Sequence, residues 1–180
     1  MILSTPSETM PVRLRTERAV GDRRSVPALA LATEAVRPLP FCLSLLNRSQ
    51  SVNLPLTPKD IRPPFGRYSH GVEAPAGSRF IFTSGQLGIR ADDSVPEDIE
   101  EQAEICFENI RSILAAGGMD LSDIVRLNAF VTKREDMRRY MNVRDRFVSE
   151  PLPASTLYIV GGFTRPEFLV EIEAVAAKSE

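Results

Sequence analysis

The sequence contains few of the side chains that build metal centres or disulfide frameworks. Its 180 residues include only two cysteines and one histidine. Cys42 and Cys106 lie 64 positions apart, with no second cysteine and no histidine near either. Neither a zinc-ligand spacing nor a disulfide framework can therefore be read, which favours a protein of the reducing cytoplasm. Cys106 falls on an apolar helix face and is expected to be a small buried hydrophobe.

Long hydrophobic runs and glycine-rich loops are also absent. The most apolar part of the N-terminal region, FCLSLL at 41–46, is far shorter than the roughly 20 residues that span a membrane. It also lacks the apolar region and cleavage pattern of a secretory signal. No phosphate-binding loop or dinucleotide fingerprint occurs, and AAGG at 115–118 is interpreted as a helix stop. The sequence predicts no membrane partner and no nucleotide cofactor.

The negative charge of the chain is concentrated after residue 48. Residues 1–48 carry seven arginines against four acidic residues, whereas the rest carries 15 basic and 20 acidic side chains. A broad phosphate-binding surface needs clustered positive charge, so this balance argues against nucleic acid as a partner. One basic segment is interleaved with acids, which predicts a solvated helix face. It contains Arg134, Arg138, Arg139, Arg144 and Arg146, with Glu135, Asp136 and Asp145 among them.

Residues 1–60 are expected to form an irregular or disordered N-terminal extension, and residues 61–180 the folded domain. The extension has scattered prolines, no sustained periodicity and polar stretches such as RLRTERAVGDRR. Such a composition buries too little apolar surface to offset the entropy of ordering. A transit peptide fits the arginine and serine content, but the acidic residues count against it. A disordered extension, or a start codon placed too early, is the preferred interpretation.

From Arg67 onward the sequence alternates strand and helix signals. The segment RFIFTSG combines aromatic and β-branched residues and ends in glycine, as strands do. A helix follows, with Ser94 and Pro96 at its start and Gly117-Gly118 at its end. Its apolar residues recur at three- and four-residue steps and predict one buried stripe. They are Ile99, Ala103, Cys106, Ile110, Ile113 and Leu114. The expected order is strand 67–72, strand 79–85, helix from about 96 to 116, strand 123–132, helix 135–149, strand 155–161 and strand 168–176.

This order predicts an α+β fold in which both helices pack on one face of a mixed sheet. Two helices cover only one side, so the opposite face stays apolar and uncovered. A patch of this kind is seldom left open on a soluble monomer, and we expect it to be buried against copies of the chain in a closed ring. The residues expected there are Phe130 with either Tyr158 and Val160 or Leu157 and Ile159, beside Glu171 and Glu173.

The last predicted strand, LVEIEAVA, has two distinct faces. Side chains alternate along a strand, so Val170, Ile172 and Ala174 point one way while Glu171 and Glu173 point the other. The first set is expected in the core. We expect Glu171 to lie at or near a subunit interface, partly removed from water.

Six motifs, in their order and spacing, resemble the RidA/YjgF family of reactive intermediate deaminases. They are GRYSHGV, FIFTSGQL, EQAEICFENIRSILAAGGMDLSDIVRLNAFVT, MRRYMNVRDRF, PLPAST and VEIEAVA, and they cover residues 65–178. The resemblance implies a chorismate-mutase-like fold and a homotrimer with three intersubunit clefts. It also implies hydrolysis of enamines and imines, such as 2-aminoacrylate released by pyridoxal-phosphate enzymes, to the 2-keto acid and ammonia. The resemblance implies neither a metal nor a cofactor.

The resemblance also assigns site residues. In the RidA subgroup, an arginine in a PARS motif clamps the substrate carboxylate, and here Ser155 stands in its place. The family's tyrosine, asparagine and glutamate fall on Tyr68, Asn142 and Glu171, and its Ser-Gly-Gln segment falls on Ser84, Gly85 and Gln86.

The serine at position 155 changes what the cleft can bind. An arginine fork makes two charge-assisted hydrogen bonds to a carboxylate, each worth roughly 1.5–3 kcal/mol. A serine hydroxyl offers one neutral donor, and the lost orientation costs about two orders of magnitude or more in rate on carboxylate-bearing imines. Three compensations stay open: Arg165 from the GFTRPE loop, Arg67 beside Tyr68, or a substrate without a carboxylate at that place.

Imine hydrolysis needs a positioned water, a proton acceptor and orienting donors. A desolvated carboxylate has its pKa raised toward neutrality and can do the proton work. Glu171 is the candidate, with a structural ion pair as its alternative, whereas Glu173 is expected to be an exposed or paired strand residue. Tyr68 either donates its hydroxyl to the substrate or packs at the rim. No signature supports a nucleophilic triad between Ser155 and His70, and His70 is expected to be a strand side chain.

Three functions follow from these residues. The leading one is an enamine or imine deaminase acting on a small metabolite, with substrate recognition altered from that of the RidA subgroup. The second is a non-catalytic ligand-binding or regulatory trimer that uses the same cleft. The third, ribonuclease activity, has also been attached to the family, but the acidic body and the single histidine disfavour it.

Overall fold

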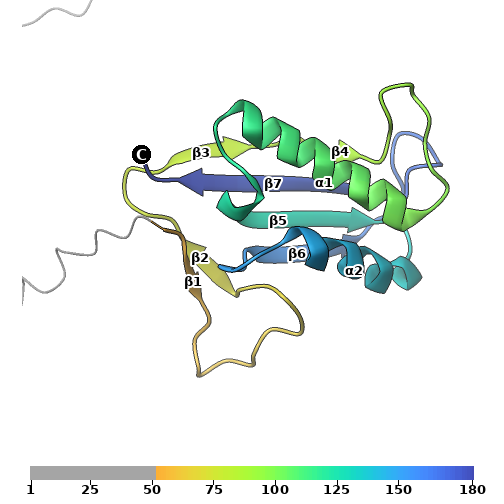
Figure 1. Ribbon diagram of the computed structural model, residues 1–180. Helices are drawn as coiled ribbons and strands as arrows, with labels where there is room; N and C mark the ends of the chain where they lie inside the picture. Colours follow the sequence, from red (N-terminus) through yellow and green to blue (C-terminus); the bar gives the residue numbers. More distant parts are fainter. Residues whose placement is uncertain (1–51) are drawn as a thin grey trace, which may run out of the picture. The chain divides into compact units, whose positions relative to one another are not determined.

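The computed structural model describes residues 52–180, and expectations for residues 1–51 lie outside this range. The predicted α+β fold is confirmed: two helices lie on one side of a mixed five-stranded sheet (Figure 1). The predicted order of elements is also confirmed, with two short strands added. The elements are β1 Leu54–Leu56, β2 Gly71–Glu73, β3 Arg79–Phe82, β4 Gln86–Leu87, α1 Ile99–Ala116, β5 Ile124–Val131, α2 Met137–Phe147, β6 Ala154–Ile159 and β7 Val170–Lys178.

The sheet has the strand order β3-β7-β5-β6, and β4 pairs with the other end of β7. Strand β7 is antiparallel to β3, β4 and β5. Strands β5 and β6 run parallel, which requires a long crossover, and α2 provides it. The register places Phe130 of β5 opposite both Glu171 of β7 and Tyr158 of β6.

Helix α1 begins at Ile99, later than the predicted start near Pro96. Asp98 is its N-cap, because the carboxylate accepts hydrogen bonds from the N–H groups of Glu100 and Glu101 at 2.8 and 3.3 Å. These bonds satisfy backbone donors that the first turn of a helix leaves open. A capping carboxylate therefore sets the start of the helix.

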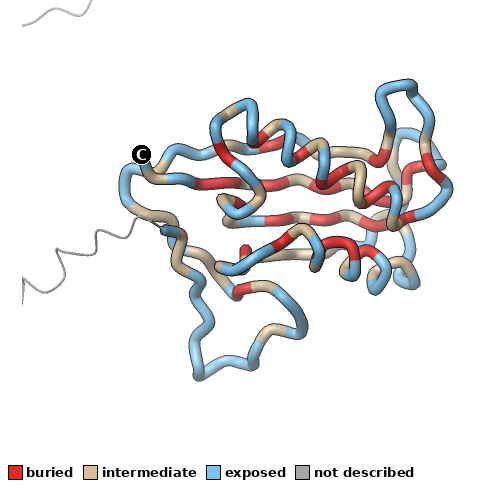
Figure 2. The backbone as a smooth tube through the Cα atoms, in the orientation of Figure 1, coloured by how far each residue is buried: buried red, intermediate tan, exposed pale blue. Residues whose placement is uncertain are grey.

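The apolar stripe predicted for α1 faces the sheet, and buried residues concentrate where the two helices lie against the strands (Figure 2). Of the predicted positions only Ile113 is half-buried rather than buried. Phe107 and Gln102 are also buried, although the prediction did not include them. The buried residues of α1 are Ile99, Gln102, Ala103, Cys106, Phe107, Ile110 and Leu114.

Burial of Gln102 leaves no polar group of its side chain without a hydrogen-bond partner, so its burial carries no desolvation penalty for an unpaired group. Its amide donates to the carbonyl oxygens of Pro96 and Glu167 at 2.7 and 2.8 Å. Its own side-chain oxygen accepts from the N–H of Leu169 at 2.9 Å. Gln102 therefore ties the segment before α1 to the loop before β7.

Strand β5 alternates as predicted except at its start. Alternate residues from Leu127 to Val131 are fully buried. Between Ile124 and Arg126, however, the register with β7 shifts, as at a β-bulge. Ile124 is therefore buried and Val125 only half-buried, which the simple alternation did not predict.

Helix α2 is shorter than the predicted 135–149, because residues 134–136 form a 3₁₀ turn. Tyr140 and Val143 are fully buried against the core. The prediction of a solvated basic face is wrong for Arg144, which is only 5% exposed. The other arginines of this segment are exposed.

The side of the sheet away from the helices carries aromatic and polar side chains. Phe130 stacks on Tyr158 with ring centroids 5.2 Å apart. Of the two predicted alternatives, the one with Tyr158 is therefore correct. Its second residue, Val160, lies beyond the end of β6. Phe80 and Phe82 of β3 are 50% and 73% exposed. We call this side the open face; its residues are Phe80, Phe82, Arg126, Asn128, Phe130, Thr156, Tyr158, Glu171, Glu173 and Val175.

A short strand lies in the part of residues 1–60 that the structure describes. β1 pairs antiparallel with β2, with Leu54 opposite Glu73. Just before it, the side chain of Asn53 donates to the carbonyl of Ala177 at 2.9 Å. The predicted irregular extension therefore has regular structure at 54–56. No helix within residues 52–180 is long and apolar enough to cross a bilayer.

Candidate functional site

Glu171 lies on the open face, opposite Leu87 of β4. Its carboxylate rests against the backbone of Gly85, since a Cβ built there would lie 1.7 Å from Glu171 Oε1. Only glycine fits here without displacing the carboxylate. We call Ser84, Gly85, Gln86 and Glu171 together the glutamate half-site.

Gln86 holds the backbone of the glutamate half-site. Its side-chain amide donates to the carbonyls of Ser84 and Gly85 at 3.1 and 3.3 Å. Its own backbone carbonyl accepts from the thiol of Cys106 at 3.0 Å. Burial, and to a lesser degree the charge of Glu171, raises the pKa of the Cys106 thiol, which keeps the thiol protonated as a donor. Cys106 is buried as predicted, and its hydrogen bond to Gln86 fixes the backbone of the half-site.

The two glutamates of β7 have different surroundings. Glu173 accepts a hydrogen bond from the amide of Asn128 at 2.8 Å, and Arg126 extends this network to Asn128 and Thr156 at 3.1 Å each. The prediction that Glu173 is a paired strand residue is confirmed. Within residues 52–180, no hydrogen bond or ion pair engages the carboxylate of Glu171, which is only half-exposed. The carboxylate of Glu171 is therefore open to a ligand.

A second group of predicted residues surrounds a pocket of about 450 Å³ between α2 and β6. Tyr68 is held beside it because the neighbouring Ser69 bonds to the chain before β6, through the carbonyls of Pro153 at 2.9 Å and Leu152 at 2.8 Å. The hydroxyl oxygen of Tyr68 accepts from the N–H of Phe65 at 3.2 Å, so its proton can be donated elsewhere. We call this cavity the hydroxyl pocket; it is lined by Phe65, Gly66, Tyr68, Met137, Met141, Arg144, Ser155, Thr156 and Leu157.

Ser155 and Arg144 both line the hydroxyl pocket. Ser155 comes from β6 and was predicted, whereas Arg144 comes from α2 and was not. The guanidinium of Arg144 donates to Asp145 Oδ1 from Nε at 2.9 Å and from Nη2 at 2.6 Å. Helical spacing could have identified Arg144, since it follows Met137 by seven residues and Met141 by three, which places all three on one helix face.

Four other residues considered from the sequence do not line the hydroxyl pocket. Asn142 is exposed on α2. Arg165 is exposed and forms an ion pair with Glu167 at 2.5 Å. Arg67 is exposed and reaches a backbone carbonyl at 3.5 Å. His70, also exposed, bonds a backbone carbonyl at 2.8 Å. Neither Arg165 nor Arg67 therefore reaches the pocket beside Ser155.

The glutamate half-site and the hydroxyl pocket are separate within one chain. Ser155 is in register with Leu127 of β5, whereas Glu171 is in register with Phe130. The two are therefore three residues apart along the strand direction, roughly 10 Å, and two strand spacings apart, again roughly 10 Å. They also point to opposite faces of the sheet. One small molecule cannot touch both groups within a single chain.

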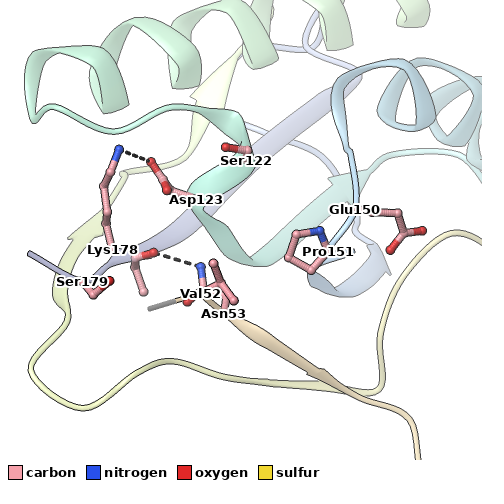
Figure 3. Close-up of a pocket in the computed structure, with 9 residues that line it drawn as sticks. Val52, Asn53, Ser122, Asp123, Glu150, Pro151, Lys178 and Ser179 are labelled. Carbon is pink, nitrogen blue, oxygen red and sulfur yellow. Dashed lines mark hydrogen bonds and ion pairs between the residues drawn. The ribbon is translucent and has the colours of Figure 1, made fainter. Parts of the chain in front are cut away.

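Another cavity, of about 210 Å³, lies where the chain before β1 meets the end of β7 (Figure 3). Lys178 binds Asp123 across it at 3.2 Å, and Asn53 is bonded to the backbone of β7. None of the predicted site residues lines this cavity. Within residues 52–180 no group of histidine, cysteine, aspartate and glutamate side chains could hold a metal ion.

The structure is an α+β domain with a carboxylate on the open face and a separate pocket between α2 and β6. Residues 60–178 match the family described as Endoribonuclease L-PSP. The chain belongs to this family, and the names of its relatives confirm the resemblance to RidA/YjgF proteins.

Relatives of known name and structure cover the same domain. The 2-iminobutanoate/2-iminopropanoate deaminase of Dermatophagoides farinae is 29% identical over 126 residues, which cover 69% of this chain and 92% of that protein. The structure of Escherichia coli TdcF with bound serine is 30% identical, with a TM-score of 0.53, and covers 68% of this chain and 93% of that one. The Rid-family protein YyfB of Yersinia pestis shares the fold, with a TM-score of 0.61 at 24% identity, over 69% of this chain and 97% of its own.

Proposed function

We propose that this chain is an imine or enamine deaminase whose active site forms between copies of the chain. The observation that carries the proposal is the carboxylate of Glu171, held against Gly85 and engaged by no hydrogen bond or ion pair within residues 52–180. A carboxylate held in place but left without a partner is suited to proton transfer. The relative from Dermatophagoides farinae, named as an iminobutanoate and iminopropanoate deaminase, supports the same reaction class.

The proposed chemistry uses Glu171 as the proton carrier. Glu171 accepts a proton from a bound water as the water oxygen forms a bond to the imine carbon. The proton is then returned to the nitrogen, which gives a carbinolamine. Glu171 next carries the proton of the carbinolamine hydroxyl to the same nitrogen, so that the carbonyl forms, the carbon–nitrogen bond breaks and ammonia leaves. Tyr68 donates a hydrogen bond that orients the substrate, while Asn142 and Gln86 complete the cleft from neighbouring surfaces.

The separation of the two groups favours a ring of copies. The glutamate half-site of one chain must meet the hydroxyl pocket of the next, so two different surfaces are in contact. Such a contact is satisfied twice in a two-fold dimer, or once between each pair of neighbours in a closed ring of three or more copies. The family resemblance favours the ring. The exposed aromatic residues of the open face would be buried in such a ring. We propose the homotrimer that the family resemblance implies.

Substrate recognition is proposed to differ from that of the RidA subgroup. Ser155 of the hydroxyl pocket supplies one neutral hydrogen-bond donor where that subgroup has a charged fork. TdcF was solved with bound serine, which bears a carboxylate. A substrate with a carboxylate remains suitable for this chain if another cation of the same pocket binds it.

The reaction is tested by ammonia release from imines generated in place by an amino-acid oxidase. We expect Glu171→Gln to lower kcat/KM by about 100-fold or more, because general acid–base catalysis contributes factors of that size. Glu173→Gln is the matched control, since it changes the neighbouring glutamate of the same strand and face, and its rate should stay within about threefold of the parent. Equal rates for the parent and Glu171→Gln on every imine would refute the proposed chemistry.

The shared site is tested by mixing two inactive variants. Glu171→Gln destroys the glutamate half-site, and Ser155→Phe fills the hydroxyl pocket. If each site takes one part from each of two chains, equal mixing with subunit exchange restores about one quarter of the parent activity, because one random pairing in four is intact. No restored activity in exchanged mixtures, confirmed by mass spectrometry, would show that both parts come from one chain.

A further inference from the structure

The hydroxyl pocket contains a buried charge that the proposed chemistry does not use. The side chain of Arg144 is only 6% exposed, and it lines the pocket together with Ser155 and Tyr68. Burying a guanidinium is costly unless charged or polar partners compensate it. The position of Arg144 therefore needs an explanation beyond packing.

Asp145, the hydrogen-bond partner of Arg144, occupies only some of the N–H donors of the guanidinium. Both hydrogen bonds go to one oxygen of Asp145, from Nε and Nη2. Within residues 52–180 no hydrogen bond uses Nη1. A guanidinium has five N–H donors in a planar fork. Several of them therefore stay available to an anion in the pocket.

The hydroxyl pocket has a volume of about 450 Å³, which leaves room for a small anion beside Arg144. Gly66 forms part of its wall, since a Cβ placed there would lie 3.7 Å from Arg144 Nη2, an ordinary packing distance. Asp145 is 35% exposed, and water can solvate its second oxygen. An incoming carboxylate can therefore bind Arg144 without displacing Asp145.

The remaining lining of the hydroxyl pocket matches a small anion with a short apolar side chain. Tyr68 and Ser155 provide hydroxyl groups, and no acidic side chain is among the described lining residues. The other walls are apolar and contain two flexible methionines, which adapt to ligands of varied shape. These apolar residues are Phe65, Met137, Met141 and Leu157.

We infer that Arg144 binds the carboxylate of a 2-imino or 2-keto acid in the hydroxyl pocket, and that Ser155 adds a hydrogen bond to the same group. The identity of this ligand rests on the proposed function; the anion site itself does not. Arg144 thus supplies from α2 the charge that position 155 of β6 lacks. Arg165 and Arg67 do not line the pocket, so Arg144 takes the role considered for them.

Calorimetric titration with 2-oxobutanoate, and with its neutral amide 2-oxobutanamide, tests the inference on the full-length chain. We expect the parent to bind 2-oxobutanoate at least about tenfold more tightly than the amide. Arg144→Gln should remove this difference. Arg138→Gln is the matched control, because it makes the same change of charge on an exposed part of the same helix, and it should keep the preference.

A second variant covers the case in which Arg144→Gln does not fold. Asp145→Asn changes a partly exposed residue and removes the negative charge that competes for the guanidinium, so it should tighten 2-oxobutanoate binding about threefold or more. Unchanged or weaker binding in Asp145→Asn, or equal affinity of the parent for acid and amide, overturns the inference.

Activity separates this inference from the proposed function. If the parent releases no ammonia but binds 2-oxobutanoate through Arg144, the anion site stands and the proposed chemistry fails. If the parent is active and Arg144→Gln keeps the same KM for imines that bear a carboxylate, the chemistry stands and the inference about Arg144 fails.

Discussion

The two faces of the sheet differ in whether helices of residues 52–180 cover them. On the covered side, Leu127, Ile172 and Phe107 are fully buried under helices of the same chain. On the open face, strands that supply this core also present Phe130 and Glu171, and no helix of residues 52–180 lies above them (Figure 1). The covered side is complete in one copy.

This difference explains why the chemical groups are divided. In the core of the covered side, side chains such as Leu127 and Ile172 are fixed by packing and leave no space for a ligand. The hydroxyl pocket lies at the edge of that side, beside the edge strand β6. Glu171 on the open face is held on one side by Gly85 and is unoccupied on the other. The face that folding leaves unfinished is therefore the face on which a second copy can add the missing part of a site.

Removing one phenylalanine from each face tests this difference most strongly. Phe107 is fully buried, whereas Phe82 is 73% exposed. Phe107→Ala should lower the free energy of unfolding by about 3–5 kcal/mol, since it loses transfer free energy and leaves a cavity. Phe82→Ala should change it by no more than about 0.5 kcal/mol in the dissociated chain. Urea unfolding at a concentration where light scattering shows single chains gives both values.

The same pair also reports on assembly. Phe82→Ala should weaken self-association measured by light scattering if the open face is buried between copies. A large loss of stability for Phe82→Ala in the dissociated chain would mean that the two faces do not differ in the way described.

Sequence predicted the covered side better than the open one. The alternation in β7 and the three- and four-residue steps of α1 correctly placed Val170, Ile172 and Ile110 in the core, because burial by the same chain imposes a period that the sequence must show. It did not predict the shift at Ile124, since a bulge depends on pairing with β7 and not on local pattern.

The candidate site was predictable only in part, and the physical reason lies in distance along the chain. The resemblance identified Glu171 and Tyr68, and the structure gives each a defined place. It did not indicate that Arg144 is buried, because charge alone favours a solvated position. The helical spacing from Met137 and Met141 was the one available signal, since the rest of the pocket comes from β6 and residues 65–68, far away in the sequence. Gln102 was missed for the same reason, since its partners lie up to 67 positions away.

A methyl group at Gly85 tests whether the position of the Glu171 carboxylate on the open face matters for the reaction. In Gly85→Ala the new methyl group would collide with the end of the Glu171 side chain. That side chain is flexible and can swing away, so the melting temperature should change little while the carboxylate leaves its position. A displacement of about 1 Å costs on the order of 100-fold in rate. Ammonia-release kinetics should therefore show kcat/KM lowered by about 100-fold.

Gly161→Ala is the matched control, because a Cβ at Gly161 meets nothing within 4 Å. Its kcat/KM should remain within about threefold of the parent. Full activity in a folded Gly85→Ala variant would show that catalysis does not depend on the position of the Glu171 carboxylate.

On the surface of the covered side, Asp98 caps α1 and pairs with Arg139 of α2. Replacing it should change stability less than the substitutions above change stability or rate. The hydrogen bond from Arg139, together with those from the N–H groups of Glu100 and Glu101, holds the pKa of Asp98 below its ordinary value of 3.8. The folded-state pKa is the lower one, so the contribution is complete above the ordinary value and is lost as pH falls through the folded value. Asp98→Ala should cost about 1 kcal/mol at pH 7.

Asp98→Asn separates the cap from the charge, because asparagine also caps helices well but does not titrate. Its free energy of unfolding at pH 7 should lie closer to the parent than that of Asp98→Ala, since an exposed ion pair contributes little. Between about pH 5 and pH 3, urea unfolding should show a smaller loss of stability for Asp98→Asn than for the parent. Parallel pH profiles for the two proteins would mean that the Asp98 carboxylate does not join the helices, and that the covered side is held by its apolar core alone.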